Sequence, residues 1–170
     1  MFYEVIFRAC QKRKIKYLVI GGVAVNLYGY YRGTADLDLM ISLDKRNLTK
    51  FMEMLFSMGF RPKIPVSMQE MSDPKKIQKW IEEKNMKVLS VYNPQNEMMH
   101  IDIMVLDLLD FGAAYKRRKV LEEGDLKVSV LSIDDLITIK KIAGRKRDKM
   151  DIMALEKIKE LEDESKKKSR

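Results

Sequence analysis

A pair of aspartates on a short apolar strand constrains this chain more than any other feature of its sequence. The segment 36–41 reads Asp-Leu-Asp-Leu-Met-Ile. Side chains two positions apart on a strand point to the same face, so Asp36 and Asp38 project together while the leucines face a core. Two carboxylates held that close repel each other unless a cation lies between them. The pair therefore predicts a divalent-metal site, and the alternative is a pair of acids exposed to water at a turn or sheet edge.

A glycine turn precedes these acids. The segment 19–24 reads Val-Ile-Gly-Gly-Val-Ala, which is typical of a buried strand running into a turn and a short helix. Bare backbone N–H groups at Gly21 and Gly22, together with the positive end of a helix dipole, would suit a phosphate. The alternative is tight packing of helix against strand with no ligand. A phosphate site beside metal-binding carboxylates predicts phosphoryl or nucleotidyl transfer.

A third acid lies on a later apolar strand, 98–106. Asp102 faces away from the apolar residues of that strand and shares its face with His100. An isolated aspartate there disfavours the fold unless it has a partner. If this strand lies beside the first acidic strand, Asp102 completes a cluster of three carboxylates, which could hold two Mg²⁺ or Mn²⁺ ions. The alternatives are a structural salt bridge for Asp102 and a simple hydrogen bond at the sheet margin for His100, which could otherwise ligate a metal or move a proton.

The remaining pattern predicts an α/β (or α+β) fold, with a mixed sheet flanked by helices and C-terminal helices packed on the core. We expect one domain over 1–163 and a basic, disordered tail over 164–170. The sequence pattern predicts no helix or strand for residues 60–73, apart from a short strand at 60–64. Predicted helices are 2–13, 22–28, 45–58, 74–84, 133–143 and 147–162, with a helical turn at 110–115. Predicted strands are 15–20, 36–42, 87–92, 98–106, 117–121 and 126–131.

Composition limits the partners and the compartment. The 170 residues carry a net charge of +8, which favours anionic partners such as nucleotides or RNA, although residues 166–170 supply four of the positive charges. The single cysteine excludes an internal disulfide and fits a reducing cytoplasm. No apolar run reaches the ~18 residues of a membrane span, and residues 1–10 lack a signal-peptide pattern. We therefore expect a cytoplasmic protein with no membrane partner.

The order of these residues also carries a resemblance. Gly21-Gly22-x-Ala24, then Gly29, then Arg32-x-Thr34-x-Asp36-x-Asp38 resembles the signature of the DNA-polymerase-beta-like nucleotidyltransferase superfamily. Within it, the chain is most similar to minimal nucleotidyltransferases of the AbiEii/MNT antitoxin–toxin kind. The resemblance implies that Asp36 and Asp38 hold both metal ions, while Asp102 holds one and accepts the proton of the incoming hydroxyl. It also implies that Arg32 and Thr34 contact phosphate, although both could be ordinary loop residues.

A second block near the C-terminus extends the resemblance. Lys140 is followed by Gly144-Arg145-x-Arg147-Asp148-x-x-Asp151, where the family has Gly-Arg-x-Lys-Asp-x-x-Asp. On a helix Lys140 falls within the apolar stripe, so it needs an anion. The resemblance implies that Lys140 reaches the nucleotide phosphates and that Arg145, Asp148 and Asp151 pin the last helix through ion pairs. The alternative is a purely structural role for the whole block.

Together these features predict an Mg²⁺-dependent enzyme that moves a nucleoside monophosphate from an NTP, such as ATP, to a hydroxyl acceptor and releases pyrophosphate. The acceptor could be a protein, an RNA end or a small molecule. The alternative is a catalytically silent module of the same fold that binds nucleotide or neutralises a toxin, since the family contains members paired with partner proteins. An RNA-binding domain is a weaker third reading, because no aromatic cluster interleaves with the basic residues. Residues 60–97 match no motif.

Overall fold

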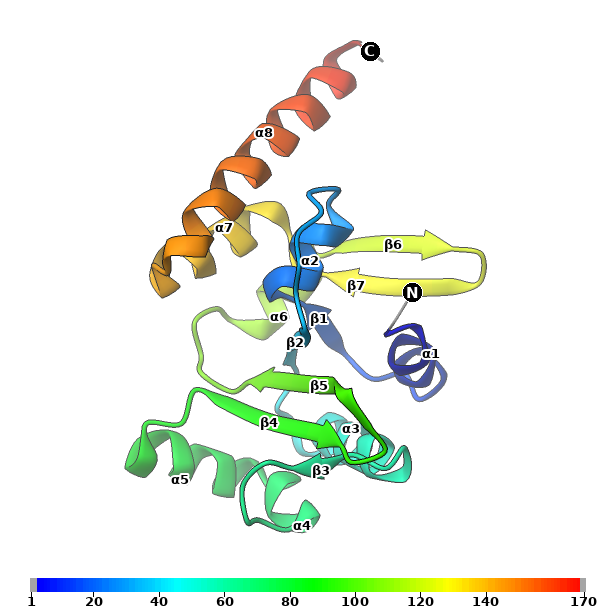
Figure 1. The fold of residues 1–170 in the computed structure, drawn as a ribbon, viewed down its shortest axis with the longest axis vertical. Coiled ribbons are helices and arrows are strands. Elements are labelled where there is room, and N and C mark those ends of the chain that lie inside the picture. Colours follow the sequence, from blue (N-terminus) through cyan, green and yellow to red (C-terminus); the bar gives the residue numbers. More distant parts are fainter. Residues whose placement is uncertain (1–2, 169–170) are drawn as a thin grey trace.

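A computed structural model describes residues 3–168 and contains one seven-stranded mixed sheet with helices around it (Figure 1). The strands are β1 Tyr17–Val19, β2 Asp36–Ile41, β3 Arg61–Pro62, β4 Val88–Asn93, β5 Asn96–Met104, β6 Lys119–Glu123 and β7 Leu126–Val130. The helices are α1 Glu4–Lys12, α2 Gly21–Leu27, α3 Lys45–Ser57, α4 Met68–Met71, α5 Pro74–Lys84, α6 Phe111–Arg117, α7 Ile133–Ala143 and α8 Lys146–Lys168.

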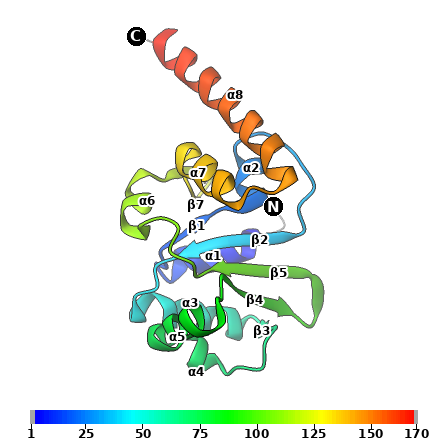
Figure 2. The same cartoon turned by 90° about the vertical axis from the view of Figure 1, so that its left-hand side faces the viewer.

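The sheet places the two acidic strands side by side at its centre. Its strand order is β3-β4-β5-β2-β1-β7-β6. The pairs β2/β5 and β1/β7 are parallel, and the other four pairs are antiparallel. Helices α3, α4 and α5 gather near the β3–β4 end, while α2 and α7 lie toward β1 and β7 (Figure 2). The predicted α/β class with a mixed sheet is confirmed.

Alternation along β2 and β5 separates a core face from a polar face. Leu37, Leu39, Ile101 and Ile103 are completely buried in the hydrophobic core. Since successive side chains of a strand point to opposite faces, the three aspartates of these strands lie on the other face. Burial of the leucines and isoleucines therefore fixes the direction in which the acids project, as the alternating pattern predicts.

Several helices begin at a residue whose side chain caps the first turn. The Asp44 carboxylate accepts a hydrogen bond from the Asn47 backbone N–H at 2.9 Å and caps α3. Asp73 caps α5 and Ser132 caps α7 in the same way. The unassigned segment 60–73 contains the short strand β3 and the one-turn helix α4. Ser67 and Glu70 form a capping box at the start of α4, a short-range signal that the sequence analysis missed.

Several predicted boundaries and one predicted face differ from the structure; β5, for example, is Asn96–Met104 rather than 98–106. Helix α6 continues to Arg117, so β6 begins at Lys119 rather than at 117. The helical spacing of apolar residues in 45–58 predicts Phe56 on the buried side of α3, but Phe56 is 47% exposed, and the Arg61 guanidinium lies 4.4 Å from its ring centroid. The cation covers one face of the ring at the surface, which the helical stripe alone could not indicate.

The C-terminal segment is helical where a disordered tail was expected. Helix α8 includes 164–168, whereas 169–170 lie outside the described residues, as does Phe2 of the predicted first helix. Acidic residues followed by lysines favour helix through propensity and spacing, which explains the difference. Both views show α8 projecting away from the sheet with the C-terminus at its far end (Figures 1 and 2). Among the described helices, none has the length and apolarity that crossing a bilayer requires.

Candidate active site

The register between β2 and β5 places acidic residues of the two strands directly opposite each other. Asp38 is paired with Asp102, and Asp36 is paired with His100. Neighbouring strands are about 4.8 Å apart, so paired side chains on one face are adjacent. A cluster of the three acids requires β5 to lie beside β2, and the two strands are paired.

The glycine turn bends toward the same acids. Gly21 has φ +64°, a conformation that residues with a Cβ rarely adopt. A Cβ atom at this position would lie only 1.9 Å from Asp38 Oδ2. The backbone N–H of Gly22 donates a hydrogen bond to Asp38. Glycine at 21 is therefore required both by the backbone conformation and by the approach of the carboxylate.

Asp38 carries a charge that the protein itself does not neutralise. Burial raises its pKa to about 6, and the nearby Asp102 and Asp36 carboxylates add to the rise. The Gly22 hydrogen bond and the more distant Arg145 offset only part of this effect. A carboxylate in this state would gain stability from a cation beside it.

Gly22 lies against the predicted phosphate-contacting loop residues. A Cβ atom on Gly22 would lie 2.6 Å from both Arg32 Nη2 and Thr34 Oγ1. The loop before β2 therefore folds back over the start of α2. The structure brings Gly21, Gly22, Arg32 and Thr34 together around one turn, although no described contact assigns a ligand to them.

Lys140 lies in a buried network of ion pairs. Its ammonium nitrogen is 2.7 Å from Asp151 Oδ2 and 3.5 Å from Asp148 Oδ1, and the side chain is 3% exposed. Asp151 Oδ1 also lies 2.9 Å from Arg32 Nε, in ion-pair contact but without hydrogen-bond alignment. Arg145 Nε donates to Asp148 Oδ2 at 2.8 Å. The anion that the apolar position of Lys140 requires is thus supplied by α8, and binding of phosphate by Lys140 stays a prediction.

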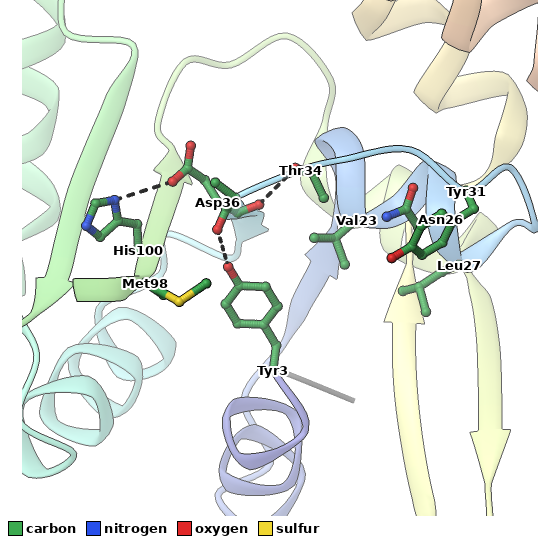
Figure 3. A pocket seen from close by; sticks show the side chains of 10 residues that line it. Tyr3, Val23, Asn26, Leu27, Tyr31, Thr34, Asp36, Met98 and His100 are labelled. Carbon is green, nitrogen blue, oxygen red and sulfur yellow. Dashed lines mark hydrogen bonds and ion pairs between the residues drawn. The ribbon is translucent and has the colours of Figure 1, made fainter. Parts of the chain in front are cut away.

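Two cavities flank the acidic strand. The smaller, about 150 Å³, is lined by Gly21, Asp38, Asp102, Lys140 and Arg145 among others. The larger, about 680 Å³, borders Asp36 and His100 instead. Figure 3 shows the larger cavity, in which the Asp36 side chain reaches toward His100 and the phenol ring of Tyr3 points toward the start of β2. Asp36 and Asp38 therefore border different spaces although they share a strand face.

The positions of the acidic side chains and of His100 decide whether these residues could hold a metal ion together. His100 Nδ1 is 3.4 Å from Asp36 Oδ1. Within residues 3–168, no three Asp, Glu, His or Cys side chains are arranged to hold a metal ion. The donor chemistry still fits a hard cation, because Asp38 and Asp102 are paired carboxylates with uncompensated charge. Binding of Mg²⁺ or Mn²⁺ by Asp36, Asp38 and Asp102 remains a prediction.

Two residues at the larger cavity were missed by the sequence analysis. The Tyr3 hydroxyl donates to the Ala35 carbonyl at 2.6 Å and ties the N-terminal segment to the start of β2. The Asn26 side chain pairs with the backbone of Arg32 through two hydrogen bonds. Neither residue belongs to a recognisable motif. A tyrosine beside a helix start or an asparagine within a helix carries no signal of a distant partner.

Comparison with known proteins identifies the family and the fold. A model of the family described as "nucleotidyltransferase of unknown function (DUF6036)" matches residues 4–168. A search of curated protein sequences gave no match.

Several solved structures share the architecture. The lincomycin-bound lincosamide antibiotic adenylyltransferase LnuA superposes with a TM-score of 0.61 at 17% identity, covering 91% of this chain and 94% of that chain. An antigenic nucleotidyltransferase-like protein from Paracoccidioides brasiliensis gives 0.57 at 19%, covering 91% and 73%. ANT(2")-Ia in complex with adenylyl-2"-tobramycin gives 0.56 at 12%, covering 99% and 97%. At these identities the likeness concerns the fold. The match over nearly the whole length, on a chain whose paired acids lie beside a glycine turn, shows that this protein belongs to a nucleotidyltransferase family.

Proposed function

We propose that this protein is an Mg²⁺- or Mn²⁺-dependent enzyme that transfers a nucleoside monophosphate from an NTP to a hydroxyl acceptor. The observation that carries the proposal is the pairing of Asp38 with Asp102, beside the left-handed turn at Gly21. Membership in a nucleotidyltransferase family supports the reaction class. The names of two structural neighbours, both linked to adenylyl transfer, make ATP the first nucleotide to test.

The reaction balances without any redox step. The acceptor oxygen forms a bond to the α-phosphorus of the NTP, and the bond from that phosphorus to the bridging oxygen breaks. Pyrophosphate leaves, and the acceptor proton passes to Asp102. Asp36, Asp38 and Asp102 would hold the metal, which when bound would neutralise charge on the phosphates. Gly21, Gly22, Arg32, Thr34 and Lys140 would bind the nucleotide.

In this proposal Arg32 would position the phosphates of the nucleotide. Its guanidinium packs against Gly22, and Asp151 limits where it can move. A planar guanidinium can donate two hydrogen bonds to a phosphate, which a lysine cannot do in the same geometry. Arg32 would therefore orient the phosphates above the glycine turn, while the buried Lys140 would contribute positive charge from behind.

A catalytically silent nucleotide-binding or toxin-neutralising module is the second candidate. Two observations favour it: Asp36 is paired with His100, and Lys140 is already paired with Asp148 and Asp151. In such a module the acids would not need to gather around an ion. The AbiEii/MNT subtype and a partner protein belong to the same open prediction.

Turnover measurements separate the two candidates. Purified protein is incubated with each NTP, Mg²⁺ and candidate acceptors, and pyrophosphate release and acceptor mass are followed. We expect Asp36→Ala to abolish turnover while the protein stays folded, because such transfers depend on charge neutralisation and positioning. The matched control is Asp134→Ala, which removes an exposed carboxylate of α7. Equal rates for wild type and Asp36→Ala would refute catalysis and leave the silent module.

A further inference from the structure

The larger cavity has a composition that indicates what can occupy it. It lies between α1, α2 and the ends of β2 and β5, with a volume of about 680 Å³. Pockets of about 300–1,000 Å³ are typical of small-molecule sites. Figure 3 shows Val23, Leu27, Tyr31 and Asn26 on one side and Asp36, His100 and Met98 on the other. The cavity therefore extends from the acidic strand along one side of α2.

The lining offers little to an anion. Among the described residues that line this cavity, none is a lysine or an arginine, and Asp36 is the only carboxylate; Lys63, outside the lining, contacts His100 at the polar end. Val23, Leu27 and Met98 supply an apolar wall. Binding of nucleic acid depends on cations that neutralise phosphates. A triphosphate or an RNA end placed along the apolar body of this cavity would meet no lining cation there, which disfavours both in this space.

Most polar groups of the lining already have partners. The Tyr3 hydroxyl donates to Ala35, and both polar atoms of the Asn26 amide are bonded to the Arg32 backbone. The Thr34 hydroxyl donates to the Asp36 carbonyl at 3.5 Å. The polar end toward the acidic strand is formed by Asp36 and His100, whose side chains lie 3.4 Å apart and are 46% and 33% exposed; Lys63 Nζ lies 3.4 Å from His100 Nδ1. The cavity thus has an apolar body and a polar end, and the polar end is at the proposed reaction centre.

We propose that this cavity binds the acceptor, and that the acceptor is a small, largely apolar alcohol without anionic groups. Its hydroxyl would lie at the polar end beside Asp36 and His100, two residues along β5 from the proposed proton acceptor Asp102. The inference rests on the proposed nucleotidyl transfer and narrows its acceptor from three classes to one. The apolar body would fill the space beside Val23, Leu27 and Met98. A carboxylate at the polar end can accept a hydrogen bond from the hydroxyl, which an apolar wall cannot.

Binding is tested first, without nucleotide or metal. The probe is Nile red, an uncharged dye that fluoresces in apolar surroundings. Met98→Trp should weaken dye binding at least about tenfold by filling the cavity, a loss of about 1.4 kcal/mol. Met98 is 73% exposed, so the change spares the core. The matched control is Met153→Trp on α8, where the methionine is 64% exposed and distant from the lining, and affinity should stay within about twofold. A second variant, Tyr31→Ala, should also weaken binding.

Competition and turnover then identify the ligand class. Decanol, menthol and estradiol should displace the dye, whereas adenosine and a short RNA with a free 3′-hydroxyl should not. The same alcohols should support Mg²⁺- and ATP-dependent pyrophosphate release, with a higher KM in Met98→Trp. Displacement by adenosine would make the cavity a nucleobase site, and displacement by RNA would make it a nucleic-acid site. Either result, or equal dye binding by Met98→Trp and wild type, would overturn the proposal. Binding of alcohols without turnover on any acceptor would instead refute the transfer reaction and retain the ligand class.

Discussion

Two clusters of carboxylates, one buried and one half-buried, are treated by the fold in opposite ways. In the network between α7 and α8, Asp151 contacts Lys140 and Arg32. Burial would raise the pKa of Asp148, but the Arg145 hydrogen bond and the charges of Arg145 and Lys140 outweigh it, and the pKa is lowered. On β2, burial and neighbouring carboxylates raise the pKa of Asp38. In the first region, which we call the complete region, every carboxylate has a basic partner. The second, the incomplete region, carries charge that the chain does not balance.

This difference distinguishes charges that hold the fold together from charges that a ligand or an ion could use. A paired buried charge is costly to break but needs nothing from outside the protein. An unpaired one lowers stability and is retained where a ligand or ion makes use of it. Comparing the two regions therefore indicates where a cation would bind, and the following experiments test that comparison.

The largest expected effect comes from breaking the complete region. Asp151→Ala should lower the free energy of unfolding by about 3–5 kcal/mol, because Lys140 loses its 2.7 Å partner while it stays buried. Urea denaturation measures the change. Asp134→Ala, which removes an exposed partner of Lys159, is the control and should cost less than about 1 kcal/mol. Similar losses for both variants would mean that the network contributes no more than a surface pair.

In the incomplete region, removing charge should stabilise the metal-free protein. The pKa of Asp38 is about 6 in the folded state against an ordinary 3.8, so the folded protein binds this proton more tightly than the unfolded chain does. The resulting stability is present below about pH 4 and is lost as the pH rises through about 6. Asp38→Asn should therefore gain about 2–3 kcal/mol above pH 6 and flatten that part of the pH–stability profile. The prediction is wrong if wild type and variant lose stability in parallel between pH 4 and pH 7.

A double-mutant cycle tests the contact between the glycine turn and the acid. Gly21→Ala should cost about 2 kcal/mol, because φ is positive and the new Cβ would meet Asp38. In an Asp38→Gly background, which removes all three Asp38 atoms near that position, only the backbone strain remains, so the cost should fall by about half. Gly33→Ala, with no atom near its Cβ position, is the control and should be close to neutral. Equal costs of Gly21→Ala in both backgrounds would show that the carboxylate does not press on the turn.

The smallest expected effect is the stabilisation of the folded protein by a divalent cation that binds at Asp38 and Asp102. Mg²⁺ at ten times its Kd should raise the free energy of unfolding by about 1.4 kcal/mol. Asp38→Asn and Asp102→Asn should abolish the gain, whereas Asp134→Ala should keep it. Thermal unfolding at matched ionic strength, with and without Mg²⁺, measures the effect. A gain of the same size in Asp38→Asn would place the cation elsewhere.

The structural features that could be predicted depend on short-range patterns in the sequence. The caps at Asp44, Asp73 and Ser132 depend on hydrogen bonds within three residues, so their sequence signals are sufficient. The orientation of β2 follows from alternation alone. The exposure of Phe56 and the helical path of 164–168 could not be predicted in the same way, because each depends on competition between burial, local pairing and solvent.

The sequence by itself determined that Asp36 and Asp38 share a strand face and that a glycine turn precedes them, since strand periodicity and backbone freedom are local properties. Only the tertiary structure decided that Asp102 pairs with Asp38, that Asp36 faces His100, and that Asp151 holds both Lys140 and Arg32. These contacts join segments far apart in the chain. Sheet register and helix packing fix them, and no local pattern encodes either one.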